Sequence, residues 1–144
     1  WEGARASAGI IILFPFYAGI TGIMQSSGLD SVVSEAFARV SDAVTYPLFT
    51  FLSAGVVYLF VPSGGGQWAV QGPIATQAAS EIGVPLSKTV MAVSYGDEWT
   101  NMLQPFWALA LLGITGLKAR HVLGYTILVL FVSAIVFSCA LLVF

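Results

Sequence analysis

The sequence predicts an all-α integral membrane fold that contains a re-entrant helical hairpin and a discontinuous transmembrane helix. Of its 144 residues, 58% are hydrophobic and 8% are charged, and the mean hydropathy is +0.90. Soluble domains carry about 25% charged residues, so this composition excludes a water-soluble globular protein. The net charge of −2 leaves no basic footprint for nucleic acid. Two polar, glycine-containing interruptions of apolar stretches predict the hairpin and the broken helix.

Residues 6–29 form the first predicted crossing. They are uncharged, and about 20 apolar residues are enough to span the hydrocarbon core. Residues 30–44 are too polar to cross. Their apolar residues recur at helical spacing from Val33 to Val44, which predicts an amphipathic helix lying in the membrane interface.

Residues 45–80 contain the first interruption and carry no charge. The two apolar arms, 46–61 and 68–80, are short for two crossings, because a helix rises only about 1.5 Å per residue. A Pro-Ser-Gly-Gly-Gly-Gln segment joins the arms. The pattern predicts a re-entrant hairpin with Ser63–Gln67 buried at its tip. Two short full crossings, with the glycines at the membrane surface, are the alternative.

Residues 87–117 contain the second interruption, where polar residues from Gly96 to Asn101 separate two apolar runs. The pattern predicts one half-helix to about Ser94, an unwound centre over Gly96–Asn101, and a second half that starts near Gln104. Residues 122–144 are uncharged and form the last predicted crossing.

The glycine-rich tip has a direct physical use as an anion receptor. Glycine permits a positive φ and leaves backbone N–H groups uncovered. The arm that begins near Trp68 would add its N-terminal amides and the positive end of its dipole. Neither interruption contains Lys or Arg, so a carboxylate would be held by dipoles alone. A phosphate loop would need Gly-Lys-Ser/Thr, which is absent from the sequence here, and a purely structural turn is the alternative.

Aromatic residues flank both interruptions and are candidates for the walls of a short acyl-tail pocket. The candidate substrate-binding residues are Ser63, Gly64, Gly65, Gly66, Gln67, Trp68 and Trp99.

Asp97 and Glu98 are the carboxylates of the second interruption. Ionisable residues at membrane depth are costly and mark ion or proton pathways. Carboxylate, hydroxyl and amide oxygens suit a hard cation, whereas a protonatable Asp97 would make the site a proton coupler. The alternative is that the break lies near the surface and a carboxylate faces water. The candidate cation-coupling residues are Gly96, Asp97, Thr100 and Asn101, with Na⁺ as the candidate ion at Asp97, Thr100 and Asn101.

An enzyme is not expected from this sequence. Neither interruption contains a His or Cys that could act as a nucleophile or base, and the sequence has no metal-ligand cluster.

Three motifs together resemble one known family. They are Val61-Pro-Ser-Gly-Gly-Gly-Gln-Trp-Ala-Val-Gln-Gly-Pro73, Tyr95-Gly-Asp-Glu-Trp-Thr-Asn-Met-Leu-Gln-Pro-Phe-Trp107 and Gly116-Leu-Lys-Ala-Arg120. They resemble the short-chain fatty acid transporter family, AtoE type, of the ion transporter superfamily. Complete members are longer, so the resemblance implies that this chain is their C-terminal portion. Superfamily members have two inverted repeats, each with a re-entrant hairpin and a broken helix, so this chain would be one repeat.

The resemblance also implies a function. It implies secondary active transport of butyrate- or acetoacetate-like monocarboxylates across the cytoplasmic (inner) membrane, coupled to Na⁺ or H⁺. The partners would be the monocarboxylate, the lipid bilayer and the N-terminal half of the same transporter, and a homodimer is compatible with this interpretation. The alternatives are a dicarboxylate-type carrier of the same superfamily, a membrane-embedded enzyme and a passive channel. A dicarboxylate would need a basic residue for its second carboxylate.

Overall fold

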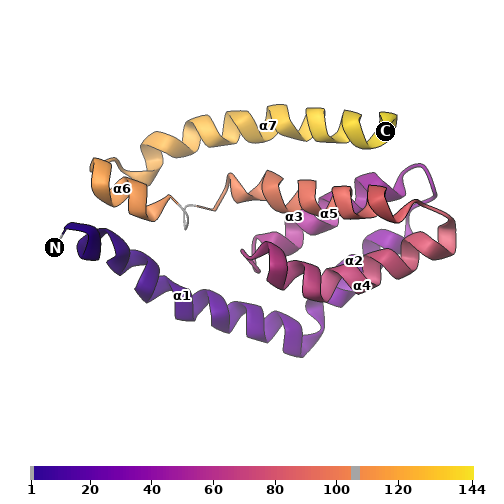
Figure 1. Ribbon diagram of the computed structural model, residues 1–144, viewed down its shortest axis with the longest axis horizontal. Helices are drawn as coiled ribbons and strands as arrows, with labels where there is room; N and C mark the ends of the chain where they lie inside the picture. Colours follow the sequence, from indigo (N-terminus) through magenta and orange to yellow (C-terminus); the bar gives the residue numbers. More distant parts are fainter. Residues whose placement is uncertain (1, 105–107) are drawn as a thin grey trace.

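The computed structural model describes residues 2–104 and 108–144, and all regular elements in these two ranges are α-helices (Figure 1). The prediction of an all-α fold is therefore confirmed. The helices are α1 (Glu2–Ser27), α2 (Leu29–Arg39), α3 (Tyr46–Tyr58), α4 (Gly64–Ile82), α5 (Leu86–Asn101), α6 (Leu109–Thr115) and α7 (Ala119–Val143).

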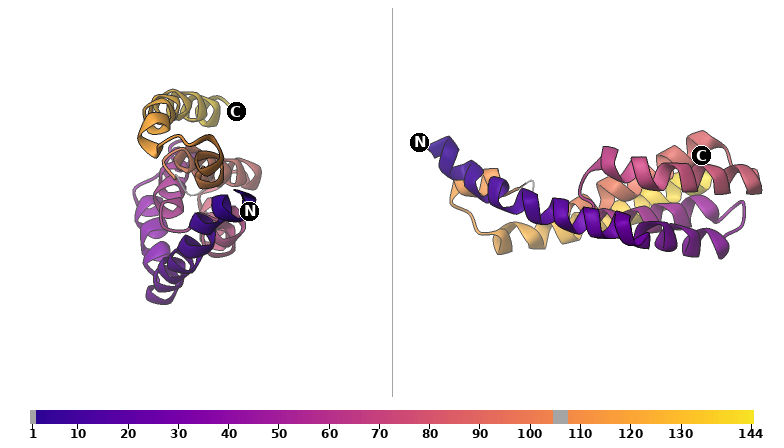
Figure 2. Two further views of the ribbon diagram at one scale, coloured as in Figure 1. Left: turned by 90° about the vertical axis from the view of Figure 1, so that its left-hand side faces the viewer. Right: turned by 90° about the horizontal axis from the view of Figure 1, so that it is seen from below.

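The helices α3, α4 and α5 lie between two long outer helices. In Figure 1, α1 runs along the lower edge and α7 along the upper edge, and Figure 2 shows both on the outside from two further directions. A buried cluster of Phe51, Ala92 and Leu141 joins α3, α5 and α7. The centre of the molecule is therefore the packing of α5 between α3, α4 and α7.

α3 and α4 form an antiparallel helical pair (Figure 1). At the base of the pair, the buried Tyr46 hydroxyl donates a 2.6 Å hydrogen bond to the backbone oxygen of Ala75. The two arms match the predicted 46–61 and 68–80 in type and order, with α3 ending three residues earlier than predicted and α4 starting four residues earlier.

α3 and α5 approach so closely that their backbones are in contact. A Cβ on Gly96 would overlap the backbone oxygen of Phe51 and would lie 2.6 Å from the Ala54 Cβ. The Thr100 hydroxyl donates to the backbone oxygen of Gly55 at 2.9 Å. Small residues that admit a neighbouring backbone, with a hydroxyl that bonds across, are typical of helix packing in membranes.

Among the described residues, α7 is the helix that is long and apolar enough to cross a membrane. Its mean hydropathy reaches 2.8, and only 11% of that stretch is buried inside the chain. Two further apolar helical segments, Ile11–Ser27 and Tyr46–Tyr58, are shorter. α1 covers most of the predicted first crossing, and α2 (Leu29–Arg39) covers residues 30–39 of the segment 30–44 that was predicted to be amphipathic.

The predicted position of the helix break is wrong. α5 continues without interruption through Asn101, so Gly96–Asn101 is helical and the helix does not stop near Ser94. Gly96 and Thr100 lie four residues apart and both face α3, which a regular helix allows and an unwound segment would not. The chain leaves helical geometry only after Met102, and α6 starts at Leu109.

The sequence signal for this break is a proline rather than the polar run. Pro105 has no N–H to donate to the carbonyl four residues earlier, so a helix that reaches Asn101 cannot continue regularly through it. The predicted start of the second half-helix near Gln104 is wrong: Gln104 lies outside the helices, and α6 begins at Leu109. Residues 105–107 lie outside the described residues.

The glycines of the tip are also helical, which corrects their predicted geometry. α4 begins at Gly64, and the glycines with a positive φ in the described residues are Gly28, Gly83 and Gly116. Ser63 is the N-cap, in extended conformation, and its hydroxyl accepts a 3.3 Å hydrogen bond from the Gly66 amide. An N-cap serine stabilises a helix start by satisfying one of the orphan amides, which here offsets the poor helix propensity of glycine.

Candidate functional site

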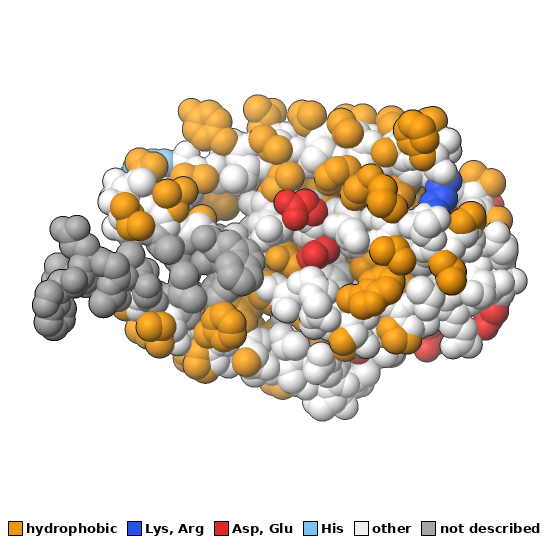
Figure 3. Space-filling view, in the orientation of Figure 1, with side chains coloured by type: hydrophobic (Ala, Val, Ile, Leu, Met, Phe, Trp, Pro, Cys, Tyr) orange, Lys and Arg blue, Asp and Glu red, His pale blue; other side chains and the backbone are white. Residues whose placement is uncertain are grey.

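The first turn of α4 lies directly against the carboxylate of Asp97 on α5. A Cβ on Gly64 would lie 2.8 Å from Asp97 Oδ2, so a residue with a side chain at position 64 would displace the carboxylate. Figure 3 shows acidic side chains near the centre of the view, among hydrophobic ones, where α4 and α5 lie. The structure therefore brings the two interruptions predicted from the sequence into contact.

The start of α4 offers two uncommitted backbone donors. The first amides of any helix lack an intrahelical acceptor. Ser63 satisfies one of them, because its hydroxyl accepts from the Gly66 amide. Its carbonyl oxygen accepts the first regular helical hydrogen bond, from the Gln67 amide at 2.8 Å. Within the described part of the chain, the amides of Gly64 and Gly65 donate to no acceptor. These amides and the positive end of the α4 dipole are a candidate receptor for an anion.

Solvent reaches this receptor from one side. Ser63, Gly64 and Gly65 are exposed in this chain, whereas Gln67 is buried. Burial of the whole Ser63–Gln67 segment, as predicted, is therefore found for Gln67 and is incomplete for the residues before it.

Behind the receptor, two glutamine amides connect α4 to α3. Gln67 Nε2 donates to the Ala54 backbone oxygen at 2.9 Å and to Gln71 Oε1 at 2.8 Å, and Gln71 Nε2 donates to Ser53 Oγ at 2.9 Å. Both glutamine side chains are 1% exposed. Because Gln67 Nε2 faces two acceptors, the orientation of its amide is fixed, and its Oε1 points elsewhere.

Two buried oxygens at this junction have no donor among the described residues. They are Gln67 Oε1 and Asp97 Oδ1. Gln67 lies three residues after Gly64, about one helical turn from the point where Asp97 contacts α4. An unsatisfied buried acceptor costs about 1–3 kcal/mol. Buried acceptor oxygens that have no donor in the folded chain are suited to bind a proton or a hard cation from solution.

The other candidate cation-coupling residues contact α3. Gly96 packs against the α3 backbone, and Thr100, 4% exposed, donates to Gly55. Asn101 Oδ1 accepts a 3.2 Å hydrogen bond from the Tyr58 hydroxyl at the end of α3. Glu98 is exposed. Of the predicted set, the structure places Asp97 against the hairpin tip and Gly96, Thr100 and Asn101 against α3.

The two candidate tryptophans have different surroundings. Trp99 lies in the core, where its Nε1 donates to the Leu130 backbone oxygen on α7 at 3.0 Å and its ring packs on Phe51 at a centroid distance of 4.8 Å. Trp68 lies over its own helix, where a Cβ on Gly72 would meet the indole at 2.8 Å. Trp99 therefore serves the packing of α5 against α3 and α7.

A cavity that is open to the surface lies between α1 and the hairpin tip, and it was not predicted from the sequence. Phe14, Ala18, Gly22 and Gln25 on its α1 side are exposed. The cavity has a volume of about 350 Å³. Its lining residues are Phe14, Tyr17, Ala18, Thr21, Gly22, Gln25, Pro62 and Ser63. The four-residue spacing of Ala18 and Gly22 on α1 is the sequence signal that corresponds to it, since small residues at this spacing leave a groove on a helix.

The side chain of Gln104 links α1 to the segment before the hairpin tip by hydrogen bonds. Its Oε1 accepts a 3.1 Å hydrogen bond from the Tyr17 hydroxyl on α1, and its Nε2 donates to the Leu59 backbone oxygen after α3 at 2.8 Å. One side chain thus ties α1, the end of α5 and the approach to the tip.

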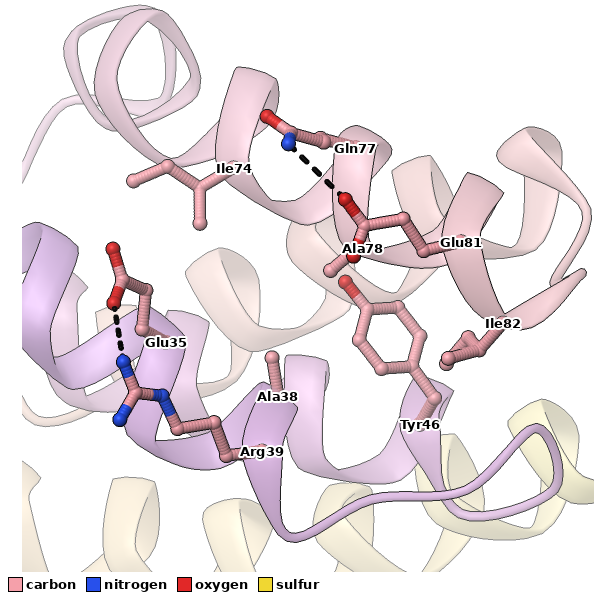
Figure 4. Close-up of a pocket in the computed structure, with 9 residues that line it drawn as sticks. All are labelled: Glu35, Ala38, Arg39, Tyr46, Ile74, Gln77, Ala78, Glu81 and Ile82. Atoms are coloured by element: carbon pink, nitrogen blue, oxygen red, sulfur yellow. Dashed lines mark hydrogen bonds and ion pairs between the residues drawn. The ribbon is translucent and has the colours of Figure 1, made fainter.

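A second cavity, of about 330 Å³, lies between α2 and α4 at the base of the hairpin (Figure 4). Arg39 pairs with Glu35 on α2 at 3.3 Å, and Gln77 donates to Glu81 on α4 at 3.1 Å. Both interactions stay within one helix, and both charged partners on α2 are more than half exposed. Its two carboxylates and single guanidinium do not favour an anion.

Comparison with known proteins identifies the family. The model of the family described as "Short chain fatty acid transporter" matches residues 1–144. The chain belongs to this family. Two relatives carry the name "Putative short-chain fatty acid transporter". The one from Escherichia coli (strain K12) is 47% identical over 141 residues, covering 98% of the chain and 32% of that protein. The one from Haemophilus influenzae (strain ATCC 51907 / DSM 11121 / KW20 / Rd) is 44% identical over 140 residues, covering 97% and 31%.

A third relative has a different named substrate. The "Putative basic amino acid antiporter YfcC" of Escherichia coli (strain K12) is 29% identical over 130 residues, covering 83% of the chain and 26% of that protein. The chain spans about a third of the length of the two short-chain fatty acid relatives. No solved structure matches it. The resemblance found in the sequence motifs is thus confirmed at the level of the family, which is described as one of transporters.

Proposed function

We propose that this chain is the C-terminal part of a secondary active transporter that carries short-chain monocarboxylates across the cytoplasmic membrane together with a cation. The family and the names of two relatives support the substrate class. The observation that carries the mechanism is the contact between the start of α4 and Asp97.

In this proposal the α3–α4 pair is a re-entrant hairpin. α3 has 13 residues and so is about 20 Å long, which is short of the roughly 30 Å hydrocarbon core. The hairpin would enter and leave on one side, with the tip at membrane depth. The second, inverted repeat would lie in the part of the longer relatives that this chain does not cover.

The substrate carboxylate would bind the amides of Gly64 and Gly65. Ser63 already commits its hydroxyl to the Gly66 amide, which keeps the first turn of α4 formed and its amides aimed outward. No Lys or Arg occurs in the sequence between Arg39 and Lys88, and Arg39 is paired with Glu35. One helix terminus can balance one carboxylate, which favours a monocarboxylate over a dicarboxylate.

The negative charge of Asp97 would oppose binding of the substrate carboxylate unless a cation binds as well. An ionised Asp97 and a substrate carboxylate would share one helix terminus, and two like charges about 4 Å apart repel by about 4 kcal/mol at an effective dielectric constant of 20. A proton on Asp97, or Na⁺ held by Asp97 Oδ1 and Gln67 Oε1, removes this repulsion. Substrate binding would then require the cation, and the two would move together.

Uptake of labelled butyrate into proteoliposomes tests this function, using the full-length transporter that contains these residues. Sodium and pH gradients are imposed separately. We expect accumulation against the butyrate gradient in the presence of one of the two gradients, and no accumulation without either. Butyrate flux that ignores both gradients would mean a passive channel, and saturation by succinate rather than butyrate would mean a dicarboxylate carrier.

A further inference from the structure

The cavity between α1 and the hairpin tip begins where the proposed carboxylate receptor ends. Ser63 takes part in both: it caps α4 beside the free amides of Gly64 and Gly65, and together with Pro62 it forms one wall of the cavity. A ligand whose carboxylate binds those amides therefore has an open volume next to its head group.

The opposite wall is a single stripe of α1. Its members recur every three or four residues, the spacing of one helix face. They are Phe14, Tyr17, Ala18, Thr21, Gly22 and Gln25. Phe14 lies at one end of the stripe, and the small residues Ala18 and Gly22 form its middle. Polar side chains lie beside them. A volume of about 350 Å³ is at the lower end of the range for small-molecule sites, about 300–1,000 Å³.

We infer that this cavity holds the hydrocarbon tail of the carboxylate, and that Ala18 and Gly22 set the longest tail that fits. This inference rests on the proposed function and deepens it. A Cβ added to Gly22 would meet no atom within 4 Å, so a side chain placed there enters open space rather than a packed interface. Trp68 and Trp99, the walls expected from the sequence, are replaced in this role by α1.

Gln104 positions this wall. It links Tyr17, one of the lining residues, to the backbone just before the tip. The distance between the α1 stripe and Pro62 is thereby fixed by hydrogen bonds rather than by contact with the ligand. A pocket whose dimensions are fixed can discriminate between carboxylates by the length of their hydrocarbon tails.

Competition by unlabelled acids against butyrate uptake tests the inference in the full-length transporter. Acetate, butyrate, hexanoate and octanoate are compared. Each buried methylene is worth about fourfold in affinity, so inhibition by the parent protein should strengthen from acetate until the tail exceeds the cavity. In Ala18→Leu and Gly22→Leu the affinity for hexanoate should fall at least about tenfold, while that for acetate changes less than about twofold.

Gly19→Leu is the matched control. Gly19 lies on the same helix, is exposed and also has no atom within 4 Å of an added Cβ, but it does not line the cavity. This variant should keep the parental order of acids. An equal shift in all three variants, or no shift in any, would overturn the inference. A parent protein that transports no carboxylate would instead overturn the proposed function.

If the leucine variants do not fold, the inference can be tested by measuring how far hexanoate protects an introduced cysteine from N-ethylmaleimide. Gly22→Cys and Gly19→Cys are made in a Cys139→Ser background, because Cys139 is an exposed free thiol. We expect hexanoate to slow the reaction of Gly22→Cys with N-ethylmaleimide at least about threefold more than it slows that of Gly19→Cys. Equal protection at both positions would contradict a tail bound at Gly22.

Discussion

The two faces of α5 pack in opposite ways although their residues alternate along one short segment. The face toward α3 presents Gly96 and Thr100, allows no added atom, and has its hydroxyl bonded to the neighbouring backbone. The face toward α4 presents Asp97, whose Oδ1 is buried without a donor among the described residues. The α3 face is completed by folding. On the α4 face Val93 packs with Ala75, whereas Asp97 keeps one oxygen without a donor among the described residues. This difference separates positions that support the fold from the position proposed to act on an ion.

Gly96→Ala should have the largest effect, because it tests the α3 face. Its Cβ would overlap the Phe51 backbone oxygen, which cannot rotate away as a side chain can. Overpacking a core typically costs about 1–3 kcal/mol, and a backbone clash belongs at the upper end or beyond it. We expect loss of the monodisperse peak in detergent size-exclusion chromatography.

Gly124→Ala in α7 is the control for this variant, because an added Cβ there meets no atom within 4 Å. It should elute like the parent. A well-folded Gly96→Ala protein would show that the close approach of α3 and α5 is not required.

Asp97→Asn comes next and tests the α4 face. It keeps the shape and removes the charge that repels the substrate and attracts the cation. We expect a normally folded protein that still binds butyrate but accumulates it no better than empty liposomes. Glu98→Gln, on the exposed neighbouring residue, should accumulate at close to the parental level. If Asp97→Asn retains gradient-driven accumulation, the coupling ion binds elsewhere.

Gly64→Ala should have an intermediate effect, since it tests the contact between the two interruptions. The methyl group would lie 2.8 Å from Asp97 Oδ2 and beside the proposed carboxylate position. Uptake of butyrate should fall about tenfold, equivalent to about 1.4 kcal/mol. Gly65→Ala, whose Cβ meets no atom within 4 Å, should transport normally and favour the helix slightly. Equal losses in both variants would mean that backbone flexibility, not space beside Asp97, is what the glycines supply.

Thr100→Val should have the smallest effect, and it should lower the stability of the protein without changing transport. It removes the hydroxyl that donates to Gly55 and keeps the side-chain shape. We expect a loss of about 1 kcal/mol in stability, observed as a lower melting temperature in detergent, with unchanged dependence of uptake on the cation. A changed cation dependence would place Thr100 in the ion site and remove the distinction between the two faces.

Much of the helical layout follows from the sequence because apolar stretches without charge leave few alternatives. The segments Tyr46–Tyr58, Gly64–Ile82 and Ala119–Val143 are helical, as their hydropathy predicts. The contact between the first turn of α4 and Asp97 is a finding of the structure, because it joins two segments that lie about 30 residues apart.

The local geometry at the interruptions could not be predicted in the same way. A Gly-Asp-Glu run resembles a break, but the steric fit of Gly96 against α3 keeps it helical. A run of glycines resembles a loop with positive φ, but the Ser63 cap starts a helix within it. Both outcomes depend on contacts with other segments, which no local pattern contains.

The α1 cavity depends on which face of an almost uniformly apolar helix turns inward. Hydropathy cannot decide this for α1, because the apolar residues of this helix are spread over all of its faces. Only the small residues Ala18 and Gly22 hint at the side, and similar glycines occur elsewhere on the same helix.

The first turn of α4 consists of three successive glycines, and this has a consequence for release of a bound carboxylate. Each glycine favours the helix by about 1 kcal/mol less than alanine would, so this turn is the least costly part of α4 to melt. Two hydrogen bonds to Ser63 close it, from the Gly66 amide to the hydroxyl at 3.3 Å and from the Gln67 amide to the carbonyl oxygen at 2.8 Å. The amides proposed to bind the substrate therefore lie on the turn of α4 that needs the least free energy to open. Opening of this turn would separate the amides of Gly64 and Gly65 and so release a bound carboxylate.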